Sequence, residues 1–472
     1  MLVPNIPNLA VISPFHWGSQ RHGGFWREAL FTLAAGLSIA LPLFGISGNI
    51  YISLTVFAVA LVISIFFYPL LGIILAFVLL GTDQLTVIIP NALSLSKLVM
   101  MFTAMAFLMR LGWTKKDLIS SLRSKVILSY ALPGVCFVLL LPFFSLLGEV
   151  NPMDMLKRFS TIISIFSYSL LICIYIKNFR QLEIAILSIV LRSTVVGVLI
   201  IFFGWGGSAS LSSSAEIDGF IVYYDHNLGI QFALTIVLSW FLLIRSSRLI
   251  KFIVYISNAI LLLCVLFTHS RSAVMGLLAV FLIIILWSIF KSSNILTLKI
   301  IITFILPILV SLFIGIYYLS EDIILDFYNR FLISFDPNYT RSIDASRISD
   351  IWPRAYNFIL EHPVIGGGLG AGEKFTAHNV VLEMGVEGGF IGIFCYILSV
   401  FYIMYVIFRV RDPLVQMWCL AMAVFVIIAS QTNPGSFYRI PYGFVVGLIA
   451  WVEIHRTYIY SRSLKPNPSM YK

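Results

Sequence analysis

Residues 249–290 read LIKFIVYISNAILLLCVLFTHSRSAVMGLLAVFLIIILWSIF, and this stretch decides the class of fold. Two apolar runs, 249–268 and 271–290, flank the polar pair His269-Ser270. Each run has about the 20 residues that a helix needs to cross the hydrocarbon core of a bilayer. The stretch therefore predicts two consecutive membrane-spanning helices.

The composition of the whole chain points the same way. Of its 472 residues, 60% are apolar and 11% are charged. Soluble proteins carry roughly 25% charged and 45–50% apolar residues. A water-soluble protein is therefore excluded, and we expect an all-α, polytopic integral membrane protein with about 12–14 transmembrane helices.

The length criterion marks the expected spans along the chain. They are 29–47, 50–67, 69–89, 94–110, 126–147, 160–177, 182–203, 227–244, 249–268, 271–290, 298–319, 388–409, 414–431 and 440–457. Gly81, Asp83, Pro90 and Lys97 interrupt the third and fourth, which could equally form a broken or re-entrant pair. We expect three parts: an N-terminal transmembrane bundle (1–319), a large periplasmic loop (320–388), and C-terminal transmembrane helices with a cytoplasmic tail (389–472).

Charge sets the expected orientation. Most of the 31 Lys and Arg residues fall on one side of the predicted spans, and most of the 21 Asp and Glu residues fall on the other. By the positive-inside rule, both termini are cytoplasmic and the large loop is periplasmic. The net charge of +10 is then a topology signal, and nucleic acid is not an expected partner because basic residues do not gather on one aromatic-rich face. The first span lacks a cleavage pattern and is expected to be retained.

The five cysteines lie in apolar runs without close pairing or a neighbouring histidine cluster, which favours small packing residues over disulfides or a metal site. They are Cys136, Cys173, Cys264, Cys395 and Cys419.

The large loop holds most of the polar groups available for chemistry. Apolar residues at helical spacing over 348–359 predict a short amphipathic helix at the membrane surface, with Pro353 in its first turn and Ser349 or Asp350 as its cap. The run Gly366-Gly367-Gly368-Leu369-Gly370 could offer backbone N–H groups to an anion but is more often a turn. A second outer loop, 204–226, is either a flexible cover or a plain linker.

Two arginines stand where the bilayer makes charge expensive. Arg271 lies at the outer head of a span, and Arg192 lies near the middle of another. An arginine at such a depth indicates a polar cavity or an anion. Snorkelling of Arg271 and a structural pairing of Arg192 are the alternatives.

These features together resemble a known family. The pattern is Ser270-Arg271 at the head of a span, Arg347 with Trp352, the segment Pro363–Gly370, and His378-Asn379 followed by Glu387, Gly389 and Gly392. It resembles the bacterial O-antigen ligase and polymerase superfamily of membrane glycosyltransferases over roughly 266–407. The stricter histidine motif of the ligases is not met, because Val380 stands where they have a polar residue.

The resemblance implies an inverting, metal-independent glycosyltransferase in the bacterial inner membrane, without a cofactor and with its active site facing the periplasm. Its donor would be a glycan on undecaprenyl pyrophosphate, and its acceptor a lipid A core or another glycan. The lipid bilayer and other polysaccharide assembly proteins are further expected partners.

Site residues follow from this reaction. Arg271 and Arg347 are assigned to the pyrophosphate, because arginine supplies a fixed charge and a planar donor fork. His378 either removes the proton of the acceptor hydroxyl or holds the pyrophosphate as a cation. The further candidates for substrate binding are Arg354, Arg192, Asn379 and His269.

Two questions stay open. The sequence does not separate polymerase from ligase, although the missing ligase motif tilts towards polymerisation. The alternative from another class is a lipid-linked oligosaccharide flippase or another polysaccharide transporter. A transporter usually shows repeat symmetry and mid-membrane charges, and here only Arg192 lies in mid-span.

Overall fold

The computed structural model describes the chain in several separate ranges. They are residues 59, 61–66, 68–79, 87–89, 93–109, 166–203, 214–217, 220–223, 226–267, 270–291, 350–375, 377, 379–432 and 440–463. The chain divides into two units, 1–72 and 73–472. The helix packing described below is that of the second unit.

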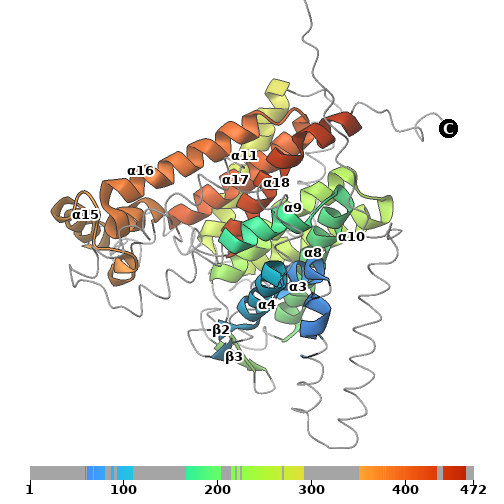
Figure 1. The fold of residues 1–472 in the computed structure, drawn as a ribbon, viewed down its shortest axis with the longest axis horizontal. Coiled ribbons are helices and arrows are strands. Elements are labelled where there is room, and N and C mark those ends of the chain that lie inside the picture. The colour runs from blue at the N-terminus through green and yellow to red at the C-terminus, as the bar shows by residue number, and fades with distance from the viewer. Residues whose placement is uncertain are drawn as a thin grey trace, which may run out of the picture. The chain divides into compact units, whose positions relative to one another are not determined.

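Helices make up nearly all of the described structure (Figure 1). They are α3 (Pro69–Leu79), α4 (Leu95–Met109), α8 (Phe179–Phe203), α9 (His226–Arg245), α10 (Arg248–Phe267), α11 (Arg271–Lys291), α15 (Trp352–Glu361), the 3₁₀ helix η2 (Ala371–Lys374), α16 (Val380–Phe408), α17 (Pro413–Thr432) and α18 (Ile440–Ser463). Within the described ranges, five helices are long and apolar enough to cross a membrane: α8, α9, α10, α16 and α17. The expectation of an all-α, multi-pass membrane protein is confirmed.

Most predicted spans that fall on described residues coincide with helices to within a few residues. Apart from the third span, the largest difference is at α16, which begins at Val380, eight residues before the predicted span, and has a break at Gly389. The predicted spans 29–47, 126–147 and 298–319 lie outside the described residues. The total number of spans and the three-part division therefore stay predictions.

The predicted third span, 69–89, is wrong as a continuous helix. Helix α3 ends at Leu79, and an antiparallel hairpin of β1 (Val87–Ile89) and β2 (Leu93–Ser94) precedes α4. The polar and helix-breaking residues Gly81, Asp83 and Pro90 follow the end of α3, so the alternative of a broken pair describes this segment better.

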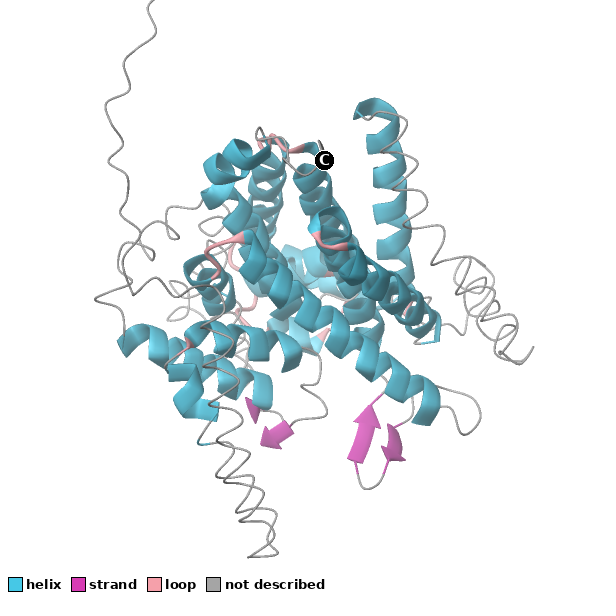
Figure 2. Ribbon diagram, turned by 90° about the vertical axis from the view of Figure 1, so that its right-hand side faces the viewer, coloured by secondary structure: helices cyan, strands magenta, loops and turns pink. Residues whose placement is uncertain are grey.

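A second hairpin lies in the loop 204–226, which the charge pattern predicts to be on the outer side. Strands β3 (Ser214–Ile217) and β4 (Phe220–Tyr223) pair through four successive positions. Figure 2 shows both hairpins as magenta arrows. The sequence of this loop indicates a flexible cover or a linker and does not predict strands.

Helices α9 and α17 form the interior of the bundle. Helix α9 contacts α8, α10, α11 and α17, and most of its residues are buried. Hydroxyl and amide side chains link the helices, as in the Ser193–Thr235 contact at 3.1 Å and the Ser239–Asn258 hydrogen bond at 3.0 Å. Such bonds hold apolar helices together where the hydrophobic effect contributes little.

Four of the five cysteines are free and buried among the packed helices, which confirms their interpretation as packing residues: Cys173, Cys264, Cys395 and Cys419. Cys136 lies outside the described residues.

Polar and aromatic contacts tie four helices together at the end of the bundle where α9 stops. Arg245, the last residue of α9, donates to Asp412 at 2.9 Å, and its guanidinium lies 4.4 Å from the ring centre of Phe179 at the start of α8. Asp412 also accepts from two amides of the first turn of α17. Trp451 of α18 meets the Phe179 ring edge-on. This end of the bundle is therefore held by an ion pair as well as by ring packing.

Candidate functional site

The most distinctive local structure is a break in α16, close to its outer end by the predicted topology. Gly389 has φ 58° and ψ −150°, a conformation that is essentially restricted to glycine. In an uninterrupted helix, the amides of Phe390 and Ile391 would donate to the carbonyls of Val386 and Glu387, four residues earlier. The break removes both bonds, so all four groups need other partners.

The glycine-rich turn supplies those partners. The amides of Phe390 and Ile391 donate to the carbonyls of Pro363 (2.7 Å) and Val364 (3.5 Å). In return, the carbonyls of Val386 and Glu387 accept from the amides of Gly367 (2.8 Å) and Gly368 (3.0 Å). Four inter-segment bonds thus replace the two that the helix loses.

The same exchange explains why glycine is required at two facing positions. A Cβ on Gly366 would lie 2.6 Å from the backbone nitrogen of Gly389, and a Cβ on Gly389 would lie 2.6 Å from the carbonyl oxygen of Pro363. The sequence left open whether this turn binds an anion or is only a structural turn. In the structure, at least two of its backbone amides donate hydrogen bonds to α16.

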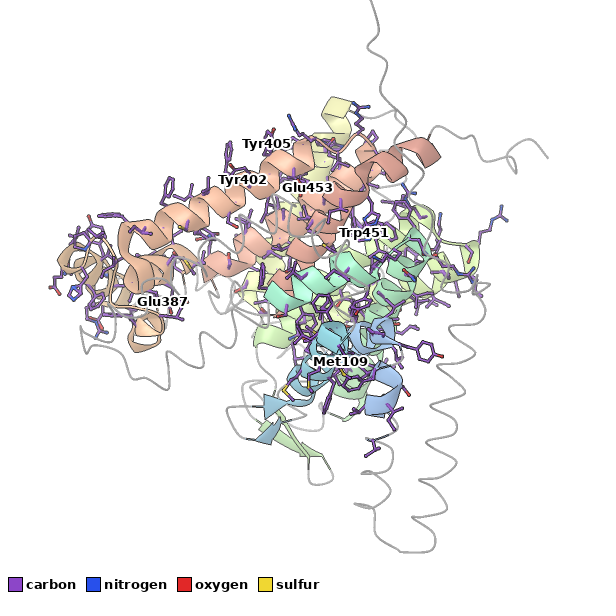
Figure 3. The ribbon with its side chains drawn as sticks, viewed as in Figure 1. Met109, Glu387, Tyr402, Tyr405, Trp451 and Glu453 are labelled. Atoms are coloured by element: carbon purple, nitrogen blue, oxygen red, sulfur yellow. The ribbon has the colours of Figure 1, made fainter. Side chains whose placement is uncertain are left out.

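Glu387 ties a further part of this turn to α16. Its side chain is fully buried, and one carboxylate oxygen accepts from the amide of Gly370 at 3.3 Å. Figure 3 shows Glu387 at the end of α16 that carries α15, whereas Tyr402 and Tyr405 lie farther along the helix. A buried carboxylate costs free energy unless it is compensated by hydrogen bonds or charge. Glu387 is thus a structural anchor of the turn.

The sequence analysis placed Glu387 in the family pattern without giving it a role. The signal that was available is its spacing from Glu383: two carboxylates four residues apart in an apolar run lie on one face of a helix. Both are buried. Acidic residues within an apolar span are a sign of function or of a specific partner.

Helix α15 packs on this end of α16 through its apolar face. Ala355 and Ile359 are buried in a cluster with Ala371, Ala377 and Val386. The face that was expected to lie on the membrane surface is therefore covered by protein. The apolar residues that the sequence placed on one side of the helix are buried because α16 and η2 take up that side.

The start of α15 differs from the prediction in its cap. Pro353 does lie in the first turn, but the N-cap is Ile351, with helical backbone angles and no side-chain cap bond. A π turn at 350–351 precedes the helix. Asp350 does not cap it, because its carboxylate accepts from Arg354 at 2.7 Å.

Trp352 positions the segment that leads into α16. Its indole N–H donates to the carbonyl of Ala377 at 2.8 Å. Two residues later, the Asn379 side chain caps α16 by accepting from the amides of Val381 (3.0 Å) and Leu382 (3.2 Å). His378 itself lies outside the described residues. The chain on both sides of it is fixed by side-chain-to-backbone bonds.

Arg271 is the first residue of α11. The hydroxyl of Ser270, which is almost fully buried, accepts from the amide of Ala273 at 3.4 Å and caps the helix. Helix α11 packs against α9 and α17. The backbone of Arg271 is thus placed at a capped helix start, and its side chain lies outside the described structure.

The structure brings some of the predicted site residues together and separates others. Arg354 and Asn379 both lie in the group of packed elements formed by α15, η2 and the start of α16. Arg192 lies on α8, where its guanidinium donates to Ser193 at 3.5 Å. Arg347 and His269 lie outside the described residues. The roles given to these residues therefore stay predictions.

No group of three or more histidine, cysteine, aspartate or glutamate residues with metal-binding geometry occurs in the described part of the chain.

A family model described as O-antigen ligase matches residues 256–397. The match supports a relationship of this segment to the O-antigen ligase/polymerase superfamily. It spans α11, α15, η2 and the broken end of α16, and it confirms the resemblance inferred from the sequence. No curated protein matches the chain.

The O-antigen ligase domain indicates a ligase- or polymerase-type role in polysaccharide assembly. Such a role requires a lipid-linked glycan donor and an acceptor at a membrane, which agrees with the apolar helices of the chain. The residues that the domain encloses include every predicted site residue except Arg192.

Proposed function

We propose that this protein is an inverting, metal-independent glycosyltransferase of the bacterial inner membrane, which transfers or polymerises glycan repeats from undecaprenyl pyrophosphate on the periplasmic face. The O-antigen ligase domain over 256–397 carries the proposal. The acceptor is another lipid-linked repeat in the polymerase form and a lipid A core or similar glycan in the ligase form.

In the proposed reaction, the hydroxyl oxygen of the acceptor attacks the anomeric carbon of the donor sugar. The bond between that carbon and the pyrophosphate oxygen breaks, and undecaprenyl pyrophosphate leaves with the bonding electrons. Arg271 and Arg347 stabilise the charge that develops on the pyrophosphate, because fixed cations are most effective where charge appears in the transition state. His378 accepts the proton of the attacking hydroxyl.

The geometry at the start of α16 supports this assignment. Trp352 fixes Ala377, and Asn379 caps α16, so the two neighbours of His378 are held by hydrogen bonds. A catalytic group must be held within a fraction of an ångström of its productive position. A loop anchored on both sides is suited to that requirement.

The alternative of a flippase or another polysaccharide transporter requires the contacts of Arg245 to break during the transport cycle. A transporter exposes its site alternately to both sides by moving helices against each other. Arg245, Asp412 and Phe179 instead join helix ends at the side predicted to be cytoplasmic. Opening that side would break a partly buried ion pair.

Purified protein in vesicles, supplied with a lipid-linked repeat donor and an acceptor, tests the transferase. We expect Arg271→Ala, Arg347→Ala and His378→Ala to abolish transfer at unchanged abundance, and lysine at either arginine position to restore it poorly because the bidentate fork is lost. Arg409→Ala is the matched control, because Arg409 lies over Tyr405 at the other end of α16. Full activity of both arginine-to-alanine variants would remove the pyrophosphate assignment.

Deleting the gene in its host separates the two forms of the reaction and the transporter. Single repeats on the acceptor, without long chains, indicate a polymerase. Long chains stranded on the lipid carrier, with a bare acceptor, indicate a ligase. Unpolymerised repeats confined to the cytoplasmic leaflet would favour the transporter.

A further inference from the structure

Helix α15 presents three kinds of surface. Successive residues of a helix are offset by about 100°, which places Tyr356 and Leu360 on an arc next to the buried Ala355 and Ile359. Both are exposed, at 56% and 50%. The arc beyond them, opposite the buried face, carries the exposed polar residues Arg354, Asn357 and Glu361. The helix therefore has an apolar face that no part of the described structure covers.

The apolar arc continues through the turn after α15. Val364 is 61% exposed, and its carbonyl is held to the amide of Ile391, next to Phe390 of α16. Val364 therefore lies beside the point where α16 resumes after its break. Val364 thus lies between the exposed apolar residues of α15 and those of α16.

From that point, an exposed apolar strip runs along α16. Its members recur every three or four residues and so share one face of the helix: Phe390, Phe394, Ile397 and Phe401, each 55–63% exposed. Because α16 is long and apolar enough to cross a membrane, this strip is the face of the helix that is suited to contact lipid tails. A lipid-facing strip on a membrane helix needs no other partner.

We infer that Tyr356, Leu360 and Val364 dock into the outer surface of the lipid bilayer, so that α15 rests at the membrane interface on the arc between its buried face and its polar residues. These residues extend the exposed apolar strip of α16 beyond the helix break. Exposed apolar patches of this kind mark membrane or protein contacts. Tyrosine is enriched at the bilayer interface, and a polar arc with charged residues is typical of interfacial helices.

The face that docks is not the one that the sequence predicted. The residues at 351, 355 and 359 pack on α16, and the helix turns its neighbouring arc outwards. The inference concerns how the domain sits in the membrane and is independent of the proposed chemistry. It would hold for a ligase, a polymerase or a transporter.

The test uses the full-length protein in phospholipid vesicles, with single cysteines that carry an environment-sensitive fluorophore. Positions 356, 360 and 364 carry the probes. Asn357 and Glu361 are the matched controls, because each directly follows a probe position, 356 and 360. The four described native cysteines are buried, and Cys136→Ser removes the fifth. The unlabelled Cys136→Ser protein, from which the single-cysteine variants are made, is assayed for transfer to confirm that it is folded.

We expect blue-shifted emission at 356, 360 and 364, with severalfold stronger quenching by lipids that carry a nitroxide near the headgroup than at 357 and 361. Equal quenching at all five positions would overturn the inference. So would unquenched labels at 360 and 364 together with disulfide cross-linking of Leu360→Cys between two copies, which would show that the face binds a second protein. If one labelled variant misfolds, the remaining two probes still decide.

Discussion

Gly366 and Gly389 meet backbone to backbone, so closely that a Cβ on Gly366 would lie 2.6 Å from the nitrogen of Gly389. Both residues have positive φ, 64° and 58°. This approach lets the turn that precedes α16 in the chain replace the hydrogen bonds that α16 loses at its break. The geometry of the candidate site depends on these two residues.

Substitution of either glycine by alanine should destabilise the protein. The backbone angles alone cost on the order of 1–3 kcal/mol for a residue with a Cβ, and the clash with backbone atoms adds to this. We expect a clear fall in the thermal unfolding temperature of Gly366→Ala and Gly389→Ala in detergent. The control is Gly385→Ala, whose Cβ meets chiefly the terminal methyl of Ile359, which can move. Equal temperatures for all three variants would contradict the role of the close approach.

Glu387 should contribute through its bond to Gly370. The variant Glu387→Ala leaves the buried amide without an acceptor, which costs about 1–3 kcal/mol. Glu387→Gln keeps an oxygen in place, so we expect it to unfold at a higher temperature than the alanine variant. If the two variants are equally stable, the contact between Glu387 and Gly370 does not anchor the turn.

Asn379 should act mainly as the cap of α16. Loss of an N-cap side chain costs about 1 kcal/mol, so Asn379→Ala should lower both stability and transfer. Asn379→Asp retains an oxygen that can accept from Val381 and Leu382, and we expect it to restore most of both. An inactive but stable aspartate variant would instead support the predicted substrate contact of the amide.

Arg354 is the most exposed of the described arginine candidates. It pairs with Asp350 four residues earlier, and both side chains are about three-fifths exposed, so the pair contributes at most about 1 kcal/mol to stability. We expect Arg354→Ala to leave stability nearly unchanged and to reduce transfer less than Arg271→Ala does. Asp350→Asn breaks the same ion pair but keeps the guanidinium, and it should retain transfer. A fully active Arg354→Ala variant would exclude Arg354 from donor binding.

The sequence alone determined the class of the protein and the position of most described spans. A helix of about twenty apolar residues is a local requirement of the bilayer, so the runs at 227–244, 249–268 and 414–431 could be read directly and coincide with α9, α10 and α17. The resemblance to the superfamily could also be inferred from the sequence, because the residues that carry it lie within one stretch that the family model matches.

Only the tertiary structure decided how the parts of the domain meet. Periodicity identified the apolar face of α15 but not its partner, since the same face suits a bilayer or a protein surface, and α16 covers it. The break at Gly389 was invisible for a similar reason: whether a glycine interrupts a helix depends on whether another segment can satisfy the freed amides and carbonyls. Here the turn at Pro363–Gly368 satisfies them, and that pairing exists only once the chain has folded.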